Sequence, residues 1–175
     1  ACDPGYAPSV ASVTCGSDGE FNETVSCVAA TCASLSVDNS SSSLSETTYD
    51  GTGTQQTSVV CNDGYSGGGT YTCTASGETS SWVGSSCTAC PENTFSTGGA
   101  ACAPCDLGHE STAASASCSP KTCEQIIADS SYVDDKLVSS YVDGTTAVSV
   151  ACDPGYAPSV ASVTCGSDGE FNETV

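Results

Sequence analysis

The sequence predicts an all-β protein made of small disulfide-rich modules that form an elongated array. Cysteine supplies 14 of the 175 residues, a density near the level that indicates a disulfide scaffold. The runs with β-type character are short, end at Gly- or Pro-containing turns and lack helical periodicity. Finally, residues 1–25 recur letter for letter at 151–175, so the chain has a period of 150 residues. Self-similarity at a fixed period indicates a tandem array.

The composition supports several small modules over one large core. Trp occurs once, Phe three times and Met not at all, which is little bulk for a single core of this size. Disulfides compensate for small cores, and they persist only in oxidising compartments, so we expect an extracellular or cell-surface protein. No run approaches 18 apolar residues, so no membrane span is expected in this segment. The start at Ala1 has no signal-peptide character, which suggests a mature segment of a longer protein.

The charge is strongly one-sided. Asp and Glu number 21 against Lys121 and Lys136 alone, for a formal net charge of −19. Such a surface repels phosphates and sulphated glycans, which argues against nucleic acid, heparin-like ligands and anionic membranes as partners. Calcium could neutralise it, but no run has the oxygen-ligand spacing of a calcium loop, so no cofactor is expected.

Two four-cysteine segments have closely similar spacing. The interval from Cys32 to Cys61 equals the interval from Cys123 to Cys152. The third cysteine then follows at nearly the same interval in both segments, the second segment being longer by a single residue. The fourth cysteine follows at a similar interval in both segments. In the second segment this cysteine is the one equivalent to Cys27, and the count continues from Cys165 into the repeated sequence after Cys15. One module is therefore complete in the chain, and the other crosses the seam between repeats.

The turn chemistry of the two segments also matches. Residues 62–65 and 153–156 contain Asp-Gly and Pro-Gly, which are turn pairs, and each is followed by a tyrosine that we expect to cap a small core. After the third cysteine come a glycine and an aromatic residue, Trp82 in one segment and Phe171 in the other. Short strands are expected in four alternating or β-branched runs, at 57–60, 70–72, 147–150 and 161–164.

This pattern of cysteines, Gly-Tyr turn and Gly-aromatic pair resembles the sushi module, also called the complement control protein domain. Phe171 departs from it, because the family usually has Trp there. The resemblance implies an elongated β-sandwich in which the first cysteine bonds the third and the second bonds the fourth. The implied pairs are Cys32–Cys73, Cys61–Cys87, Cys123–Cys165 and Cys2–Cys27. Cys15 and Cys152 would pair into neighbouring repeats.

Residues 88–118 carry a different pattern. Cys90-Pro-Glu-Asn-Thr-Phe-Ser is followed by a Gly-Ala-Ala-Cys-Ala-Pro-Cys run that ends at Cys105, and residues 106–111 repeat the pattern loosely. This resembles the short EGF-like cysteine-rich repeat of ephrin-receptor and growth-factor-receptor-like ectodomains. The resemblance implies the bonds Cys90–Cys102 and Cys105–Cys118, which close two successive small loops.

The same residues allow a zinc ribbon as an alternative. Two C-x-x-C pairs, one from Cys87 to Cys90 and one from Cys102 to Cys105, have a plausible ligand spacing. Using Cys87 as a ligand would leave the complete four-cysteine segment without one of its cysteines. The oxidising context also favours disulfides.

The predicted domain order follows from these patterns. Residues 1–27 end a sushi-like module begun in the preceding repeat, 32–87 form a complete one, 88–118 form the cysteine-rich module, and 119–175 begin a sushi-like module finished in the next repeat. The linkers are very short, which restricts pivoting. The serine run inside 38–46 is the one stretch expected to be flexible.

Sequons at Asn22, Asn39 and Asn172 predict surface N-glycans in a secreted protein. Catalysis has little support, because His109 is the only histidine and its neighbours Gly108 and Glu110 indicate a loop. We therefore expect no enzyme activity and no metal site.

The identical end segments favour a structural role. The expected function is a structural repeat unit of a secreted, glycosylated filament, stalk or cell-surface appendage, such as a mastigoneme-like hair. Its main partner would then be itself, through adjacent repeats or copies along a fibre. The alternative is an adhesion or receptor-ectodomain module that binds a protein partner, since both families resembled here often do so.

Overall fold

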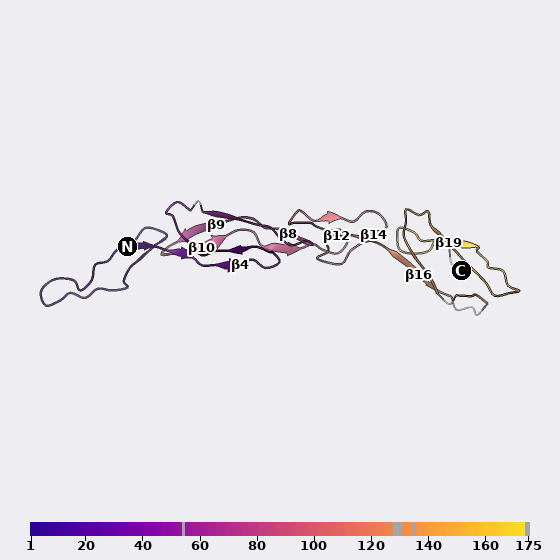
Figure 1. The fold of residues 1–175 in the computed structure, drawn as a ribbon, viewed down its shortest axis with the longest axis horizontal. Helices are drawn as coiled ribbons and strands as arrows, with labels where there is room; N and C mark the ends of the chain where they lie inside the picture. The colour runs from indigo at the N-terminus through magenta and orange to yellow at the C-terminus, as the bar shows by residue number, and fades with distance from the viewer. Residues whose placement is uncertain (54, 128–130, 135, 174–175) are drawn as a thin grey trace. The chain divides into compact units, whose positions relative to one another are not determined.

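A computed structural model describes residues 1–53, 55–127, 131–134 and 136–173 (Figure 1). Within these ranges every regular element is a β-strand, and six disulfides join the chain. The predicted class, all-β with small disulfide-rich parts, is confirmed. The chain divides into two compact units, residues 1–88 with 98–100 and residues 89–97 with 101–175. The predicted domain boundaries and the array stay predictions.

The first unit is built from short strands around one three-stranded antiparallel sheet, in the order β10-β9-β7. The other strands form the pairs β1–β2, β3–β6, β4–β5 and β8–β11. The strand bounds are β1 Tyr6–Pro8, β2 Cys27–Ala29, β3 Thr31–Cys32, β4 Leu35–Ser36, β5 Ser43–Leu44, β6 Thr47–Thr48, β7 Gln56–Val59, β8 Tyr65–Gly67, β9 Gly69–Ser76, β10 Thr79–Val83 and β11 Cys87–Ala89.

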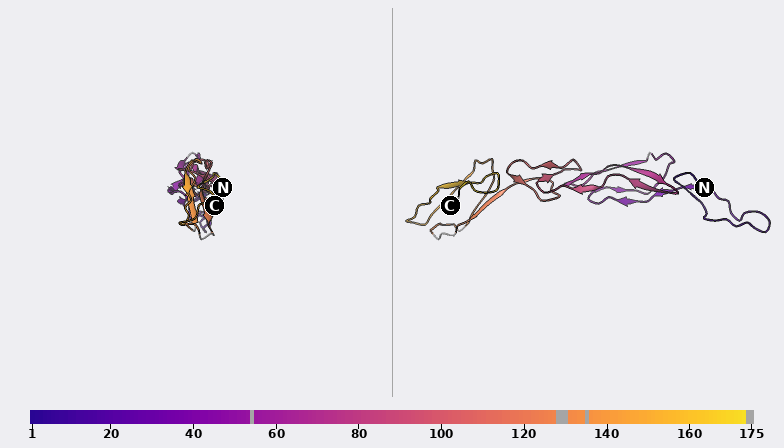
Figure 2. Two further views of the ribbon diagram at one scale, coloured as in Figure 1. Left: turned by 90° about the vertical axis from the view of Figure 1, so that its right-hand side faces the viewer. Right: turned by 180° about the vertical axis from the view of Figure 1, so that it is seen from behind.

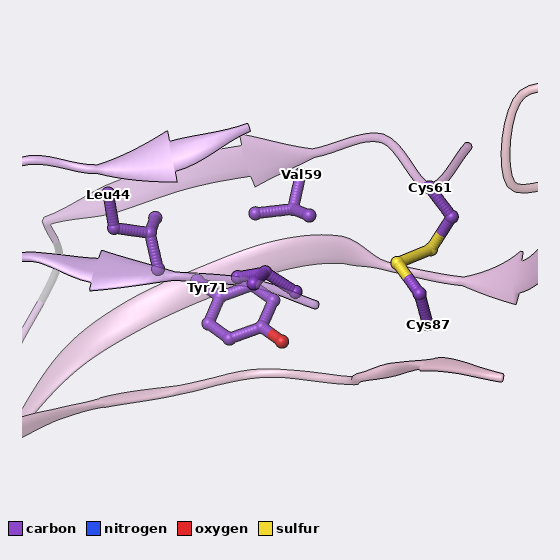
Figure 3. Packing of buried hydrophobic residues seen from close by; sticks show 6 residues of the cluster. Leu44, Val59, Cys61, Tyr71 and Cys87 are labelled. Atoms are coloured by element: carbon purple, nitrogen blue, oxygen red, sulfur yellow. A yellow bond between two sulfur atoms is a disulfide. The ribbon is translucent and has the colours of Figure 1, made fainter. Parts of the chain in front are cut away.

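The core of this unit forms around Tyr71 on β9. Side chains alternate along a strand, so Tyr71 and Cys73 face inward together, and both are buried. Leu44 and Val59 approach the Tyr71 ring, and the Cys61–Cys87 disulfide closes one end of the cluster (Figure 3). Val37 completes the buried set, while Tyr65 and Trp82 pack against it. The Tyr71 hydroxyl donates to the Ser85 carbonyl at 2.9 Å.

The serine run between Asp38 and Glu46 is held by the core, so the expectation of a flexible stretch is wrong. Ser40 Oγ donates to the Val37 carbonyl at 2.9 Å, and Leu44 is only 1 % exposed. One apolar residue among serines is enough to anchor the loop, because burying a leucine side chain stabilises by roughly 1.5–3 kcal/mol.

The second unit consists of four antiparallel pairs, β12–β13, β14–β15, β16–β17 and β18–β19. Its strands are β12 Thr94–Phe95, β13 Ala103–Pro104, β14 His109–Glu110, β15 Ser119–Pro120, β16 Thr122–Ile126, β17 Lys136–Ser140, β18 Ala147–Ser149 and β19 Ser162–Thr164. The first two pairs are alike, because each joins two residues of one strand to two of the other. The four strands expected at 57–60, 70–72, 147–150 and 161–164 are confirmed as β7, part of β9, β18 and β19.

The core of the second unit lies between β16–β17 and β18–β19. Ile127, Leu137, Val150 and Val163 form one buried cluster. The Cys123–Cys165 disulfide and Tyr141 form a second, and Phe171 packs against both. The segment that repeats the N-terminus is therefore part of this core.

Candidate functional site

The repeated segment forms the same local hairpin in both copies. In the first copy Gly16 N donates to Glu20 O at 2.7 Å, and Thr14 N donates to Asn22 Oδ1 at 2.7 Å. In the second copy the equivalent residues make the same bonds, at 2.7 and 2.6 Å. A bridge joins the residue pairs Cys15 with Phe21 and Cys165 with Phe171. This hairpin is thus set by local sequence.

The first copy packs through its beginning. Cys2 is bonded to Cys27, and β1 pairs with β2. The Tyr6 ring stands edge-on to Tyr49, with 6.3 Å between ring centroids. Beyond β1 the chain runs out as a loop and returns to β2 (Figures 1 and 2), and there Phe21 is 67 % exposed. Cys15, on this loop, is an exposed free thiol.

The second copy packs through its end. Val163 is fully buried, Cys165 is bonded to Cys123, and Phe171 lies against the core. The backbone of its beginning bonds residues 131–133, with Val133 N donating to Ala151 O at 3.1 Å and Asp153 N to Ser131 O at 2.9 Å. The Tyr156 side chain is nevertheless 65 % exposed, and Cys152 is a free thiol. The expectation that Tyr156 caps a core is therefore wrong, because most of its side chain is exposed, whereas the equivalent Tyr6 ring lies against Tyr49. Tyr65, the equivalent tyrosine of the complete segment, does pack against its core.

All 14 cysteines lie in the described part of the chain, and every one except Cys15 and Cys152 forms a disulfide. The zinc-ribbon alternative is excluded, because its four cysteines are all in disulfides and zinc requires thiolates. Six disulfides indicate an extracellular or secreted protein. The pairs are those that the family resemblances imply, namely Cys2–Cys27, Cys32–Cys73, Cys61–Cys87, Cys90–Cys102, Cys105–Cys118 and Cys123–Cys165.

Two of the three predicted glycan acceptors share one environment. Asn22 and Asn172 are exposed, and each uses Oδ1 to accept the backbone N–H across the hairpin. The amide nitrogen, which would carry a glycan, is not used in that bond. Asn39 is exposed as well, in a turn with φ of 59°. Thr174, the last residue of the Asn172 sequon, lies outside the described residues.

A second arrangement was not predicted from the sequence and occurs twice. In it a Gly-aromatic turn of one segment packs against a tyrosine of the next segment, and we call this contact a joint. In the first unit the turn ending in Gly5 and Tyr6 lies against Tyr49; Ala30 N donates to Gly5 O at 2.7 Å, and Tyr49 N donates to Ala30 O at 2.8 Å. A Cβ on Gly5 would come closer than 3.0 Å to the Tyr49 ring. Only glycine fits there.

The second unit repeats this joint with other residues. Lys121 N donates to Gly108 O and Tyr141 N to Lys121 O, both at 2.8 Å. His109 stands edge-on to Tyr141 with 6.3 Å between centroids, and a Cβ on Gly108 would meet that ring. The only histidine thus packs in a joint. The signal was present in the sequence as Asp-Pro-Gly-Tyr and Asp-Leu-Gly-His, each followed later by a tyrosine on the next segment.

The surface hollows offer little for a small ligand. One of about 540 Å³ is lined by hydroxyl groups with Glu92, Asn93 and Glu110. Among the residues that the structure describes, no three His, Cys, Asp or Glu side chains gather as a metal would need. No helix in the described ranges is long and apolar enough to cross a membrane.

No family model, curated protein or solved structure matches this chain. The geometry of the repeated segment is therefore the main indication of what the chain does.

Proposed function

We propose that the chain is a structural repeat unit of a secreted, glycosylated extracellular filament, stalk or mastigoneme-like appendage. The order sushi-like, sushi-like, ephrin-receptor-like cysteine-rich would recur along it. The observation that carries the proposal is the complementarity of the two identical segments. Cys15 is free in the first copy, whereas its equivalent Cys165 is bonded in the second. Cys152 is free in the second copy, whereas its equivalent Cys2 is bonded in the first. The two copies together therefore account for one complete four-cysteine module.

The proposed seam follows from this complementarity. Cys15 in the first copy has no disulfide partner. The second copy indicates which cysteine the partner would be, because the equivalent Cys165 bonds Cys123. Conversely, Cys152 lacks the partner that Cys2 has in Cys27. In a tandem array the partner of Cys15 comes from the preceding repeat and that of Cys152 from the following one, so every module is closed by two disulfides. Each such bond stabilises by roughly 2–4 kcal/mol.

The surface suits a fibre whose repeats must not aggregate laterally. A net charge of −19 on this chain makes neighbouring fibres repel one another. Glycans at Asn22, Asn39 and Asn172 would add bulk on exposed turns. The main partner in this proposal is the next copy of the repeat, with no nucleic acid and no lipid surface involved.

Immunogold electron microscopy tests the proposal. An antibody against this chain should label extracellular fibres at a regular axial spacing, and non-reducing peptide mapping of those fibres should find Cys15 bonded to a cysteine in the position of Cys123. Label confined to isolated monomers that bind a protein partner saturably would contradict the filament and favour the adhesion or receptor alternative.

A further inference from the structure

A third copy of the turn that opens each joint stands in the structure without the residues that complete it. Tyr156 N donates to Asp153 O at 3.0 Å, as Tyr6 N does to Asp3 O. The glycine of the turn has φ of 98°, within the same positive range as Gly5 at 86°. Around Gly155, however, the described residues leave open space where a Cβ would stand. The turn therefore forms without the contacts that its equivalent makes with Ala30 and Tyr49.

We propose that the turn of residues 153–156 is a docking surface for the following copy of the repeat. Gly155 would seat beneath the tyrosine at the position of Tyr49, and its carbonyl would accept the amide at the position of Ala30. The Tyr156 ring, now 65 % exposed, would stand edge-on to the same tyrosine. This inference rests on the proposed function, because it requires a repeat that follows.

The occupant is identified by the first copy of the segment. Residues 1–6 and 151–156 are identical, and residues 1–6 make these contacts with Ala30 and Tyr49 in this structure. The following repeat supplies the same two residues at the same distance along the chain. The third joint is thus built from parts already seen together.

The chemistry of the joint fits partners of like charge. Repeats that share a strong negative charge repel one another, so charge complementarity cannot hold them. Backbone hydrogen bonds, a strand pair and two edge-on rings need no opposite charges, and aromatic pairs add about 0.5–1.5 kcal/mol beyond their buried area. With the Cys2–Cys27 type of disulfide close by, the joint sets the orientation between repeats.

A chain of two periods tests this, made by adding residues 26–175 after Val175. Gly155→Ala is placed in both the one-period and the two-period chain, so that the strain of a positive φ is common to both. We expect calorimetry to show a midpoint lowered by about 4 °C or more in the two-period chain beyond the change in the one-period chain. The positive control is Gly5→Ala, because a Cβ there would clash with the Tyr49 ring. The negative control is Gly19→Ala, which also has a positive φ, of 84°, but has no neighbour within 4 Å. Tyr156→Ser serves as a second variant and should lower the midpoint only in the two-period chain.

Non-reducing peptide mapping of the same chain separates the two proposals. A bond from Cys152 to the following copy of Cys27, together with the larger effect of Gly155→Ala, supports the docking surface. If the same bond forms but Gly155→Ala has equal effects in both chains, the docking surface is contradicted while the tandem array is still supported. A Cys152 that stays free overturns both.

Discussion

Residues 1–25 and residues 151–175 are identical in sequence, yet the structure buries opposite halves of them. The first copy is held at its beginning by Cys2–Cys27 and by Tyr6 against Tyr49. The second copy is held at its end by Cys123–Cys165 and by Val163 in the core. The hairpin inside each copy is the same.

The comparison separates local from tertiary structure within one molecule. Sequence-local hydrogen bonds form in both copies, whatever surrounds them. Burial depends on which partners the chain supplies: β18 pairs with β19 of the second copy and Cys123 on β16 bonds its Cys165, whereas β2 and Tyr49 receive the first copy. Matched substitutions at equivalent positions of the two copies therefore have different expected effects, and four of them test this from largest to smallest.

Removing the disulfide that only the second copy makes should have the largest effect. Replacing both Cys123 and Cys165 with Ser should destabilise residues 119–173 by about 2–5 kcal/mol, because the bond joins positions with a sequence separation of 42. Hydrogen exchange of the Val163 region measures it. Cys15→Ser, at the equivalent position of the first copy, should change stability by less than about 0.5 kcal/mol. Equal effects at the two positions would contradict the structural difference between the copies.

The core valine of the second copy should be the next most sensitive position. Val163→Ala removes two methyl groups from a fully buried site and should cost about 1.5–3 kcal/mol in the free energy of unfolding, measured by chemical denaturation. Val13→Ala, at a half-buried site, should cost less than half as much. A larger cost at Val13 would show that the first copy has a core that the structure lacks.

The aromatic residue of the hairpin should follow. Phe171→Ala should destabilise the second unit by about 1–3 kcal/mol, since the ring packs against both of its clusters but is not fully buried. Phe21→Ala should stay within about 0.5 kcal/mol, because that ring is 67 % exposed. Thermal unfolding of both variants measures the difference, and a melting point for Phe171→Ala equal to that of the parent chain would contradict the packing of Phe171 against the two clusters.

The side-chain bond across the hairpin should have the smallest effect, and the same effect in both copies. Asn22→Ala and Asn172→Ala each remove an exposed hydrogen bond to a backbone N–H and should cost about 0.5–1.5 kcal/mol of local stability. Amide exchange at Thr14 and Thr164, in protein made without glycosylation, measures it. A protection loss in one copy alone would show that the hairpin is not set locally.

Much of the fold could be predicted because it is governed by spacing and turn chemistry. The β7, β9, β18 and β19 strands lie where short β-type runs precede or follow cysteines, and the turns at Gly64 and Gly155 have the positive φ that their Asp-Gly and Pro-Gly pairs favour. The six disulfides join the cysteines that the family resemblances imply. The burial of Leu44, in contrast, could not be predicted, because it follows a serine run and composition does not show which single apolar residue reaches a core.

The candidate site could be predicted only in part. The sushi-like cysteine pattern predicted that Cys15 and Cys152 have no partner within this chain, and both are free thiols in the structure. The joints could not be derived from them, since Gly5 under Tyr49 and Gly108 under Tyr141 bring together residues that are distant in the sequence. Their cause is steric, and steric fit appears only once the segments are placed in space.

The sequence by itself determined the period, the β-type runs and the hairpin of the repeated segment, because short-range hydrogen bonds and turn residues specify these locally. Only the tertiary structure decided that Val163 is buried while Phe21 and Tyr156 are exposed. Burial is a property of the partner surface and not of the segment, so one repeated sequence has two different sets of buried side chains.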